Sequence, residues 1–160
     1  MPLRAAALVL VVLLAFPGAV VAATQQSTPA ATQQGTPRAD DLTGTAGADR
    51  INGRGGNDTI RGRAGSDRLN GGRGNDLIFG DSGRDVISGG PGDDTLLGGA
   101  GNDRISAGAG ADLVTGGSGN DVVRARDGQV DRVTCGPGRD RVVADPRDIV
   151  AHDCEAVERG

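Results

Sequence analysis

The sequence predicts an all-β solenoid wound with 18 residues per coil, and three observations lead to that fold class. A nine-residue unit recurs without insertion from residue 44 to residue 124. The chain holds 29 Gly among 160 residues, and it has no Trp or Tyr. Each unit carries one aliphatic residue at a fixed place. A short fixed period is typical of solenoids, and glycine at this density disfavours a helix.

The nine units share three positions. Position four is Gly, position six is Asp, and position eight is Ile, Leu or Val in every unit. Position one is Gly in eight units and Ala107 in the remaining one. The units read GTAGADRIN, GRGGNDTIR, GRAGSDRLN, GGRGNDLIF, GDSGRDVIS, GGPGDDTLL, GGAGNDRIS, AGAGADLVT and GGSGNDVVR.

Each unit divides into a turn and a strand. The first six positions suit a turn because Gly accepts positive φ without strain. The last three are β-prone, and the middle one points inward because side chains alternate along a strand. Two units complete one coil, so turns 18 residues apart stack at about 4.8 Å. The expected strand centres are Ile51, Ile60, Leu69, Ile78, Ile87, Leu96, Ile105, Val114 and Val123.

The position-six aspartates are the candidate site residues. One edge of the solenoid is expected to carry Asp49, Asp67, Asp85, Asp103 and Asp121, and the other Asp58, Asp76, Asp94 and Asp112. Stacked carboxylates raise one another's pKa unless a positive ion lies between them. Carboxylate and carbonyl oxygens suit Ca²⁺, whereas zinc prefers His or Cys, which the repeats lack. The alternative is a metal-free solenoid in which each Asp shapes its own turn.

Stacking of turns 18 residues apart predicts seven calcium sites between them. The sites pair residues 49/67, 58/76, 67/85, 76/94, 85/103, 94/112 and 103/121. A central aspartate such as Asp85 therefore belongs to two pairs, and Asp49 belongs to one.

The units GGRGNDLIF, GGAGNDRIS and GGSGNDVVR resemble the RTX, or haemolysin-type, calcium-binding nonapeptide GGxGxDxUx. The resemblance covers residues 44–124, with a weaker echo at 135–143. It implies a parallel β-roll, Ca²⁺ between stacked turns, and a ligand role for the nine aspartates and for carbonyls of the early turn residues. Four arginines depart from the motif and are expected to weaken some sites: Arg54, Arg63, Arg73 and Arg84.

The N-terminal 43 residues are expected to lie outside the roll. Residues 1–23 read as a signal peptide, with a 12-residue apolar run and small residues before a cleavage point after Ala22 or Ala23. The alternative is an uncleaved anchor, although a span needs about 20 apolar residues. A duplicated polar octamer, ATQQSTPA at residues 23–30 and ATQQGTPR at residues 31–38, indicates a disordered linker over residues 24–43.

Residues 125–160 are interpreted as degenerate repeats and a C-terminal cap. Cys135 and Cys154 are the only cysteines. In an exported protein an even count favours a disulfide, which would close the cap over the last coil. Two free thiols, or a metal site with His152, are the alternatives. The stretch CGPGRDRVVADPRDIVAHDC also resembles the Cys-bearing end of secreted actinobacterial members of the family.

The chain is therefore expected to be a secreted, extracellular protein that folds on binding Ca²⁺. A net charge of -4 argues against nucleic acid as a partner, and no membrane association is expected once the signal peptide is removed. No Gly-x-Ser-x-Gly motif accompanies the repeats, so the chain is not expected to be an enzyme. The alternative function is a calcium-stabilised surface adhesion or scaffold module, with a protein or cell-surface partner that the sequence does not identify.

Overall fold

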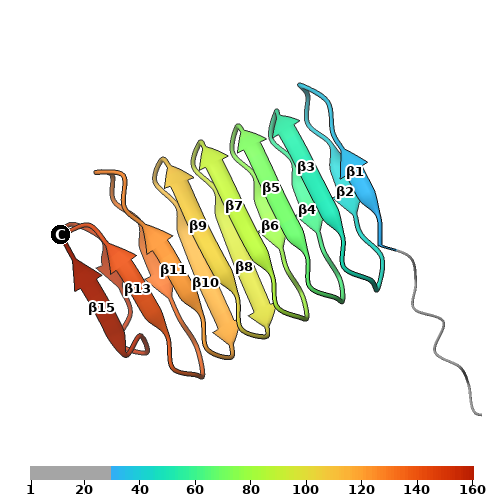
Figure 1. Cartoon of the computed structure of the whole chain (residues 1–160). Coiled ribbons are helices and arrows are strands. Elements are labelled where there is room, and N and C mark those ends of the chain that lie inside the picture. Colours follow the sequence, from blue (N-terminus) through green and yellow to red (C-terminus); the bar gives the residue numbers. More distant parts are fainter. Residues whose placement is uncertain (1–29) are drawn as a thin grey trace, which may run out of the picture.

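The structure, a computed structural model, describes residues 30–160 and shows two parallel β-sheets that face each other along one solenoid (Figure 1). The expected signal peptide, residues 1–23, lies outside the described residues. From residue 30 onward the chain forms strands and turns, and no helix there is long and apolar enough to cross a membrane.

Odd-numbered strands form one sheet and even-numbered strands form the other, because the chain changes sheet at every turn. The eight-stranded sheet runs β1 (Thr32–Gln34), β3 (Arg50–Gly55), β5 (Arg68–Arg73), β7 (Val86–Pro91), β9 (Arg104–Ala109), β11 (Val122–Ala125), β13 (Arg141–Ala144) and β15 (Ala156–Arg159). The seven-stranded sheet runs β14 (Ile149–Val150), β12 (Arg132–Thr134), β10 (Leu113–Ser118), β8 (Thr95–Ala100), β6 (Leu77–Phe79), β4 (Thr59–Arg61) and β2 (Asp41–Thr43).

The register of the strands confirms the 18-residue coil. Within the eight-stranded sheet Ile51 pairs with Leu69, and within the seven-stranded sheet Ile60 pairs with Ile78. All these pairings are parallel, as the resemblance implied. Each unit therefore stacks on the unit two places along the chain.

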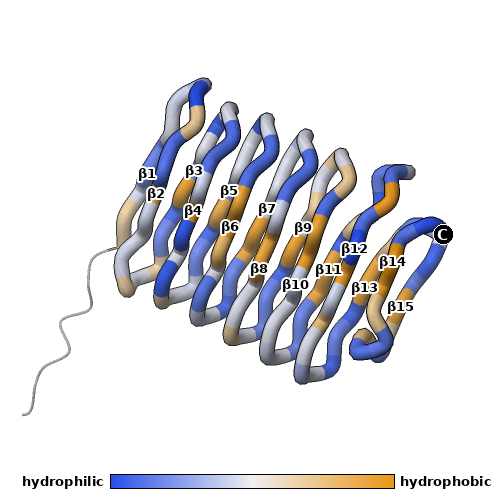
Figure 2. Tube along the Cα trace, turned by 180° about the vertical axis from the view of Figure 1, so that it is seen from behind, coloured by the Kyte–Doolittle hydropathy of each residue, from blue (hydrophilic) through white to orange (hydrophobic). Residues whose placement is uncertain are grey.

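The core is a narrow layer of aliphatic side chains between the two sheets, and both sheets contribute to it. All nine expected strand centres are buried, and Ile78 has 0% of its surface exposed. Val133 and Val142 continue the same apolar layer beyond the last regular unit. The apolar residues form a band along the middle of the strands (Figure 2).

The strands are longer than the sequence pattern predicted. Six of them contain six residues and run from position seven of one unit to position three of the next. Position one therefore lies inside a strand and, like position eight, points inward, as buried Gly53 and Gly71 show. After these six strands the turn proper is confined to positions four to six. At position four, Gly83 has a φ of 136°, and a Cβ there would collide with the Gly65 carbonyl of the previous coil.

The expected disordered linker over residues 24–43 is wrong for residues 30–43, which form the first coil. Gln33 in β1 pairs with Ile51, and Leu42 in β2 pairs with Ile60. This segment lacks the repeat composition, but pairing with an exposed strand edge uses backbone groups and needs little aliphatic surface. The Gln33 side chain points toward the interior and its Nε2 donates to the Thr43 carbonyl at 2.7 Å. Residues 24–29 lie outside the described part of the chain.

Residues 125–160 continue the roll to its C-terminal end. The expected disulfide is present: Cys135 and Cys154 are bonded, with Cα atoms 5.2 Å apart. The ten-residue unit is absorbed in a turn, so that β12 regains its register with Val114 opposite Val133. Strands β14 and β15 are themselves the last strands of the two sheets, so the tail extends the roll and leaves its final edge in place.

A core substitution tests the packing of this layer. Ile78→Ala should lower the free energy of unfolding by about 2–5 kcal/mol, because the two sheets cannot close around the missing atoms. The matched control is Leu113→Ala on the outer surface, where Leu113 is 46% exposed. That change should stay within about 0.5 kcal/mol. Urea unfolding of both variants checks this, and equal effects would contradict the assigned core.

Candidate metal centre

A buried acidic residue stands immediately before each strand from β3 to β14. These twelve aspartates have between 0% and 5% of their surface exposed. Six lie along the edge that leads into the odd-numbered strands: Asp49, Asp67, Asp85, Asp103, Asp121 and Asp140. Six lie along the opposite edge: Asp58, Asp76, Asp94, Asp112, Asp131 and Asp148. All nine sequence-predicted residues are therefore gathered in two rows, as expected.

One oxygen of each carboxylate holds neighbouring coils together. The Oδ1 atom of Asp85 accepts a hydrogen bond of 2.8 Å from the backbone N–H of Asp67, one coil earlier. The Asp85 N–H in turn donates to Oδ1 of Asp103 at 2.8 Å. The same bond recurs along both edges between successive aspartates. The bonded partner lies in the adjacent coil, so the carboxylate does more than shape its own turn.

The other oxygen has no partner. Ten Oδ2 atoms are buried and accept no hydrogen bond within the described residues: those of Asp58, Asp67, Asp76, Asp85, Asp94, Asp103, Asp112, Asp121, Asp131 and Asp140. A buried ionised oxygen without a donor is costly. Rows of such atoms are suited to a positive group from outside the chain.

A backbone carbonyl converges with Oδ2 beside the glycine at position one. A Cβ built on Gly62 would lie 2.5 Å from Asp67 Oδ2 and 2.8 Å from the Gly80 carbonyl oxygen of the next coil. At Gly116 the corresponding distances are 2.6 Å to Asp121 Oδ2 and 2.8 Å to the Cys135 carbonyl. We call this pair of acceptor oxygens beside a position-one glycine an oxygen cradle. Only glycine leaves the two oxygens room to approach each other.

Seven units contain a complete cradle, with a position-one glycine and an unpartnered Oδ2. Their aspartates are Asp58, Asp67, Asp76, Asp85, Asp94, Asp103 and Asp121. The two converging groups of each cradle are oxygen acceptors, the kind of ligand that hard divalent cations such as Ca²⁺ prefer. The residues present therefore fit a calcium ion.

The carboxyl groups are strongly perturbed. Burial raises the pKa of Asp85 and of Asp94 to about 7, and neighbouring carboxylates add to the rise, although a backbone N–H bond opposes it. Burial likewise raises the pKa of Asp121 and of Asp131 to about 6. Asp49 differs. Burial acts to raise its pKa, but hydrogen bonds from Ala31 and Thr45 outweigh burial and lower it.

A second ladder supports the turns from outside. At position five, the Asn75 N–H donates to Oδ1 of Asn57 at 2.9 Å, and the Asp93 N–H donates to Oδ1 of Asn75 at 3.0 Å. These bonds run opposite to those of the buried aspartates, because here the earlier coil supplies the acceptor. The amide at position five is therefore explained by coil stacking and needs no ion.

The turn arginines do not neutralise the buried carboxylates. Arg54, Arg63, Arg73 and Arg84 are exposed. The ion pairs among the described residues join Arg126 to Asp145 and Arg141 to Glu158. The expectation that turn arginines weaken particular sites by pairing with them finds no support in these contacts.

Three aspartates of the two rows were missed by the sequence reasoning: Asp131, Asp140 and Asp148. Asp131 and Asp140 are buried in the same two rows and have the same unpartnered Oδ2. The available signal was an Asp followed two residues later by Val133 or Val142. The ten-residue unit that contains Asp131 hid it from a strict nine-residue count.

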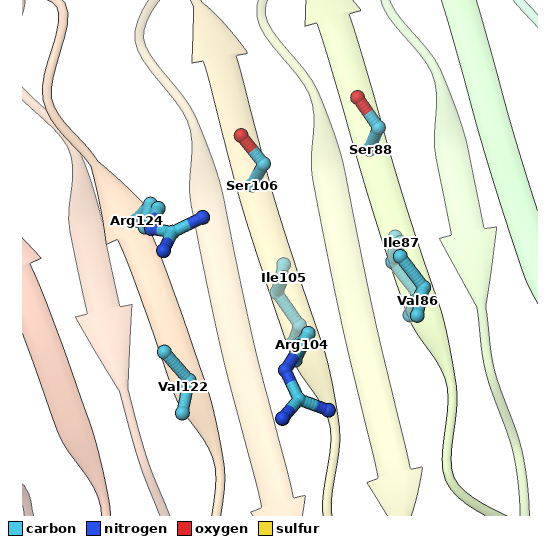
Figure 3. Close-up of a pocket in the computed structure, with 8 residues that line it drawn as sticks. All are labelled: Val86, Ile87, Ser88, Arg104, Ile105, Ser106, Val122 and Arg124. Carbon is cyan, nitrogen blue, oxygen red and sulfur yellow. The ribbon is translucent and has the colours of Figure 1, made fainter.

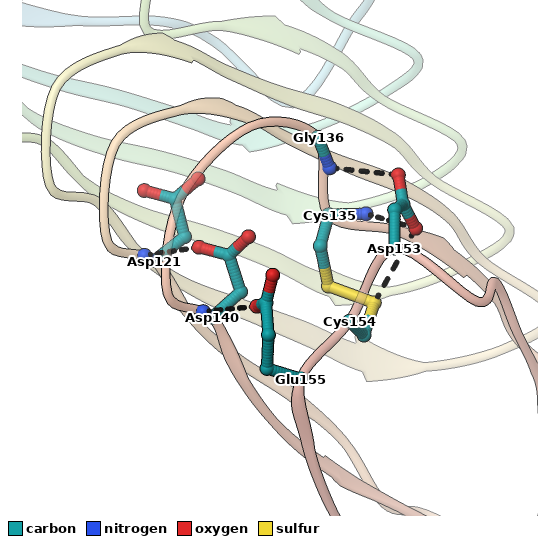
Figure 4. Close-up of a disulfide and its surroundings, with 7 residues drawn as sticks. All are labelled: Asp121, Cys135, Gly136, Asp140, Asp153, Cys154 and Glu155. Carbon is teal, nitrogen blue, oxygen red and sulfur yellow. Dashed lines mark hydrogen bonds between the residues drawn. A yellow bond between two sulfur atoms is a disulfide. The ribbon is translucent and has the colours of Figure 1, made fainter.

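The cysteines do not form a metal site. Ligand atoms of Cys135, Asp153 and Cys154 lie within 4.8 Å of one another. The two sulfurs are bonded to each other, however, so neither is a thiolate. The Asp153 carboxylate instead accepts the N–H groups of Cys135 and Gly136 (Figure 4), and His152 is exposed on the surface.

The fold and the cradles together define a parallel β-solenoid whose stacked turns present oxygen ligands to a cation. The model of the RTX calcium-binding nonapeptide repeat matches residues 34–69, 61–96 and 88–123, which span more than half of the chain. The protein belongs to this repeat family. Comparisons with curated proteins and with solved structures gave no significant match.

Protonation provides an ion-free test of these carboxylates. The native pKa of Asp85 and Asp94 is about 7, above the unfolded value of about 3.9. The folded state therefore binds more protons than the unfolded state between these values, and stability rises as pH falls through that window. Without calcium, β-structure should increase on acidification from about pH 8 to about pH 5, as measured by circular dichroism. Asp85→Asn, which mimics the protonated form, should reduce the pH dependence, and loss of β-structure on acidification would contradict the assignment.

Proposed function

We propose that the protein is a secreted calcium-binding β-roll whose folding is coupled to Ca²⁺. The observation that carries this proposal is the row of buried Oδ2 atoms that have no donor among the described residues. An ion would supply the missing positive charge between stacked turns. Secretion is supported by the apolar N-terminal run, residues 5–16, and by a cystine in the described fold.

The proposed ligands are the position-six carboxylates and the position-one carbonyls. Of the nine aspartates singled out from the sequence, seven have a complete cradle, and these are the strongest candidates. Asp49 is weaker, because its Oδ2 already accepts the Thr45 N–H. Asp112 lies beside Ala107, where the cradle lacks its glycine.

The role of the ion is structural. When bound, it neutralises charge that the fold has removed from water and joins turns of consecutive coils. Most units contribute a single large aliphatic side chain to the core, so the roll has little other apolar surface to stabilise it. Folding and binding would then be one event, with a dissociation constant on the order of 10⁻⁴–10⁻³ M, as for extracellular modules.

A pair of aspartate variants tests this function. Asp85→Asn should raise the Ca²⁺ concentration at the folding midpoint by about tenfold, equivalent to about 1.4 kcal/mol. Asp49→Asn should change it much less, because Asp49 Oδ2 has a protein donor. Circular dichroism during titration with Ca²⁺, and separately with Mg²⁺, measures both variants and the parent. Full β-structure in excess chelator at neutral pH, or an equal response to Mg²⁺, would refute calcium-coupled folding.

The outer face of the eight-stranded sheet favours a second candidate function, a surface adhesion module. Five arginines project from this face: Arg50, Arg68, Arg104, Arg124 and Arg141. Only Arg141 has an acidic partner among the described residues, Glu158. Arg104 and Arg124 border a shallow hollow of about 180 Å³ that also contains Ser88 and Ser106 (Figure 3). An overall acidic protein thus presents one cationic, hydroxyl-bearing face.

This face suits an extended polymer that carries carboxylate or phosphate groups. Guanidinium groups bind such anions in a bidentate manner, and a flat sheet offers contacts along its whole length. The double variant Arg104→Ala/Arg124→Ala should weaken binding to a carboxylated polysaccharide by at least about tenfold. The matched control is Arg132→Ala on the opposite face. Isothermal titration at two salt concentrations measures both, and a control that weakens binding equally would exclude this face.

A further inference from the structure

The complete cradles occupy only the middle of the roll, and the chain treats the two ends differently. At the C-terminal end the position-one glycine is replaced along both edges. Ala107, Ala125 and Ala144 take its place beside Asp112, Asp131 and Asp148 in turn. On the other edge Cys135 takes its place beside Asp140. All four replacing residues are fully buried, with 0% of their surface exposed.

A side chain at position one interferes with the cradle directly. Wherever glycine is present, a Cβ would lie within contact distance of both the Asp Oδ2 and the carbonyl oxygen of the next coil. At Gly62 these distances are 2.5 Å and 2.8 Å, far shorter than a methyl group tolerates from an oxygen. A real methyl at this position therefore keeps the two oxygens from converging, and it adds apolar contact in their place.

On the cysteine edge a covalent bond joins two consecutive coils. Cys135 and Cys154 occupy consecutive coils, 19 residues apart, and their bond joins those coils. The aspartate row beside it ends without a further aspartate: the Asp140 N–H donates to Oε2 of Glu155 at 2.8 Å (Figure 4). The disulfide thus links two coils where a position-one glycine is missing.

At the N-terminal end of the roll, two threonines donate hydrogen bonds to the aspartates of the first two turns. Thr36 and Thr45 stand at position two, where later units mostly have glycine. The Thr36 N–H donates to Oδ2 of Asp40 at 2.6 Å, and the Thr45 N–H donates to Oδ2 of Asp49 at 2.5 Å. The oxygen that is unpartnered in the central units therefore has a protein donor in the first two turns.

From these contacts we infer that the calcium-binding stretch is bounded at both ends, and that protein groups replace the ion there. Thr36 and Thr45 supply donors at the N-terminal end, and Ala125, Ala144 and the Cys135–Cys154 bond hold the C-terminal coils without an ion. This inference rests on the proposed calcium binding. It adds that Asp131 and Asp140, although buried and unpartnered like the central aspartates, do not bind calcium.

Two aspartates on the same edge provide the matched test. Asp94 and Asp131 are both buried and both have an unpartnered Oδ2, but Gly89 accompanies the first and Ala125 the second. In the full chain, Asp94→Asn should lower the number of bound Ca²⁺ ions, measured by equilibrium dialysis, by at least about one per chain. Asp131→Asn should leave that number unchanged. An equal loss for both variants would overturn the inference.

A variant that is expected to gain sites separates the loss of a calcium site from misfolding of the Asp→Asn variants. Ala107→Gly/Ala125→Gly restores the glycine beside Asp112 and Asp131 and should raise the number of bound ions above that of the parent. In calcium-free buffer, hydrogen exchange should protect the strands from β12 to β15 of the parent more than those from β5 to β8. Unchanged stoichiometry in the glycine variant would overturn the inference while leaving calcium binding intact. A parent that binds no Ca²⁺ at all would instead overturn the proposed function.

Discussion

The structure depends on buried carboxylates whose negative charge is not balanced by other groups among the described residues. Each central aspartate uses Oδ1 to accept the N–H of the previous coil and leaves Oδ2 without a donor. The hydrogen bond to Oδ1 requires that the carboxylate be buried. Burial in turn makes an Oδ2 atom without a donor energetically costly. A narrow aliphatic layer cannot offset ten such oxygens by itself. The residue that joins the coils is also the residue proposed to bind the cation, so stacking and ion binding would be coupled through one side chain.

This coupling explains which positions of the unit are restricted. Position six must be an acid, position eight must fill the interior, and position one must have no side chain if the oxygens are to converge. Positions seven and nine point away from the interior and are free to vary. The two outer faces have accordingly diverged. Arg50, Arg68 and Arg104 project from one face, whereas Leu77, Phe79 and Leu97 project from the other. On that second face the Arg61 guanidinium lies 4.5 Å from the centre of the Phe79 ring.

Much of this was predictable, because a strict period repeats the same physical constraint nine times. The aliphatic layer, the two rows of aspartates and the parallel stacking all follow from the nine-residue spacing. The first coil was not predictable in the same way, because Gln33 and Leu42 are ordered by pairing with β3 and β4 rather than by their own composition. Asp131 was not predicted because its unit has one extra residue, which shifts it out of the nine-residue period. The turn accommodates that residue, so the strand register is kept. The separate roles of Oδ1 and Oδ2 depend on atomic geometry that no spacing encodes.

The direction of the carboxylate ladder makes the two ends of the roll unequal. Each Oδ1 reaches back to the coil before it, so in the last described coil the aspartate N–H uses an acceptor other than a following aspartate. Glu155 supplies this acceptor on one edge, where its longer side chain accepts the Asp140 N–H. On the other edge the Asp148 N–H donates to the carbonyl of Asp145 in its own turn at 3.2 Å. At the opposite end the Thr36 and Thr45 N–H groups donate to the Oδ2 atoms of Asp40 and Asp49. Thr36, Thr45 and Glu155 therefore supply contacts at the ends of the described roll, where the stacking interaction has no neighbouring coil to continue it.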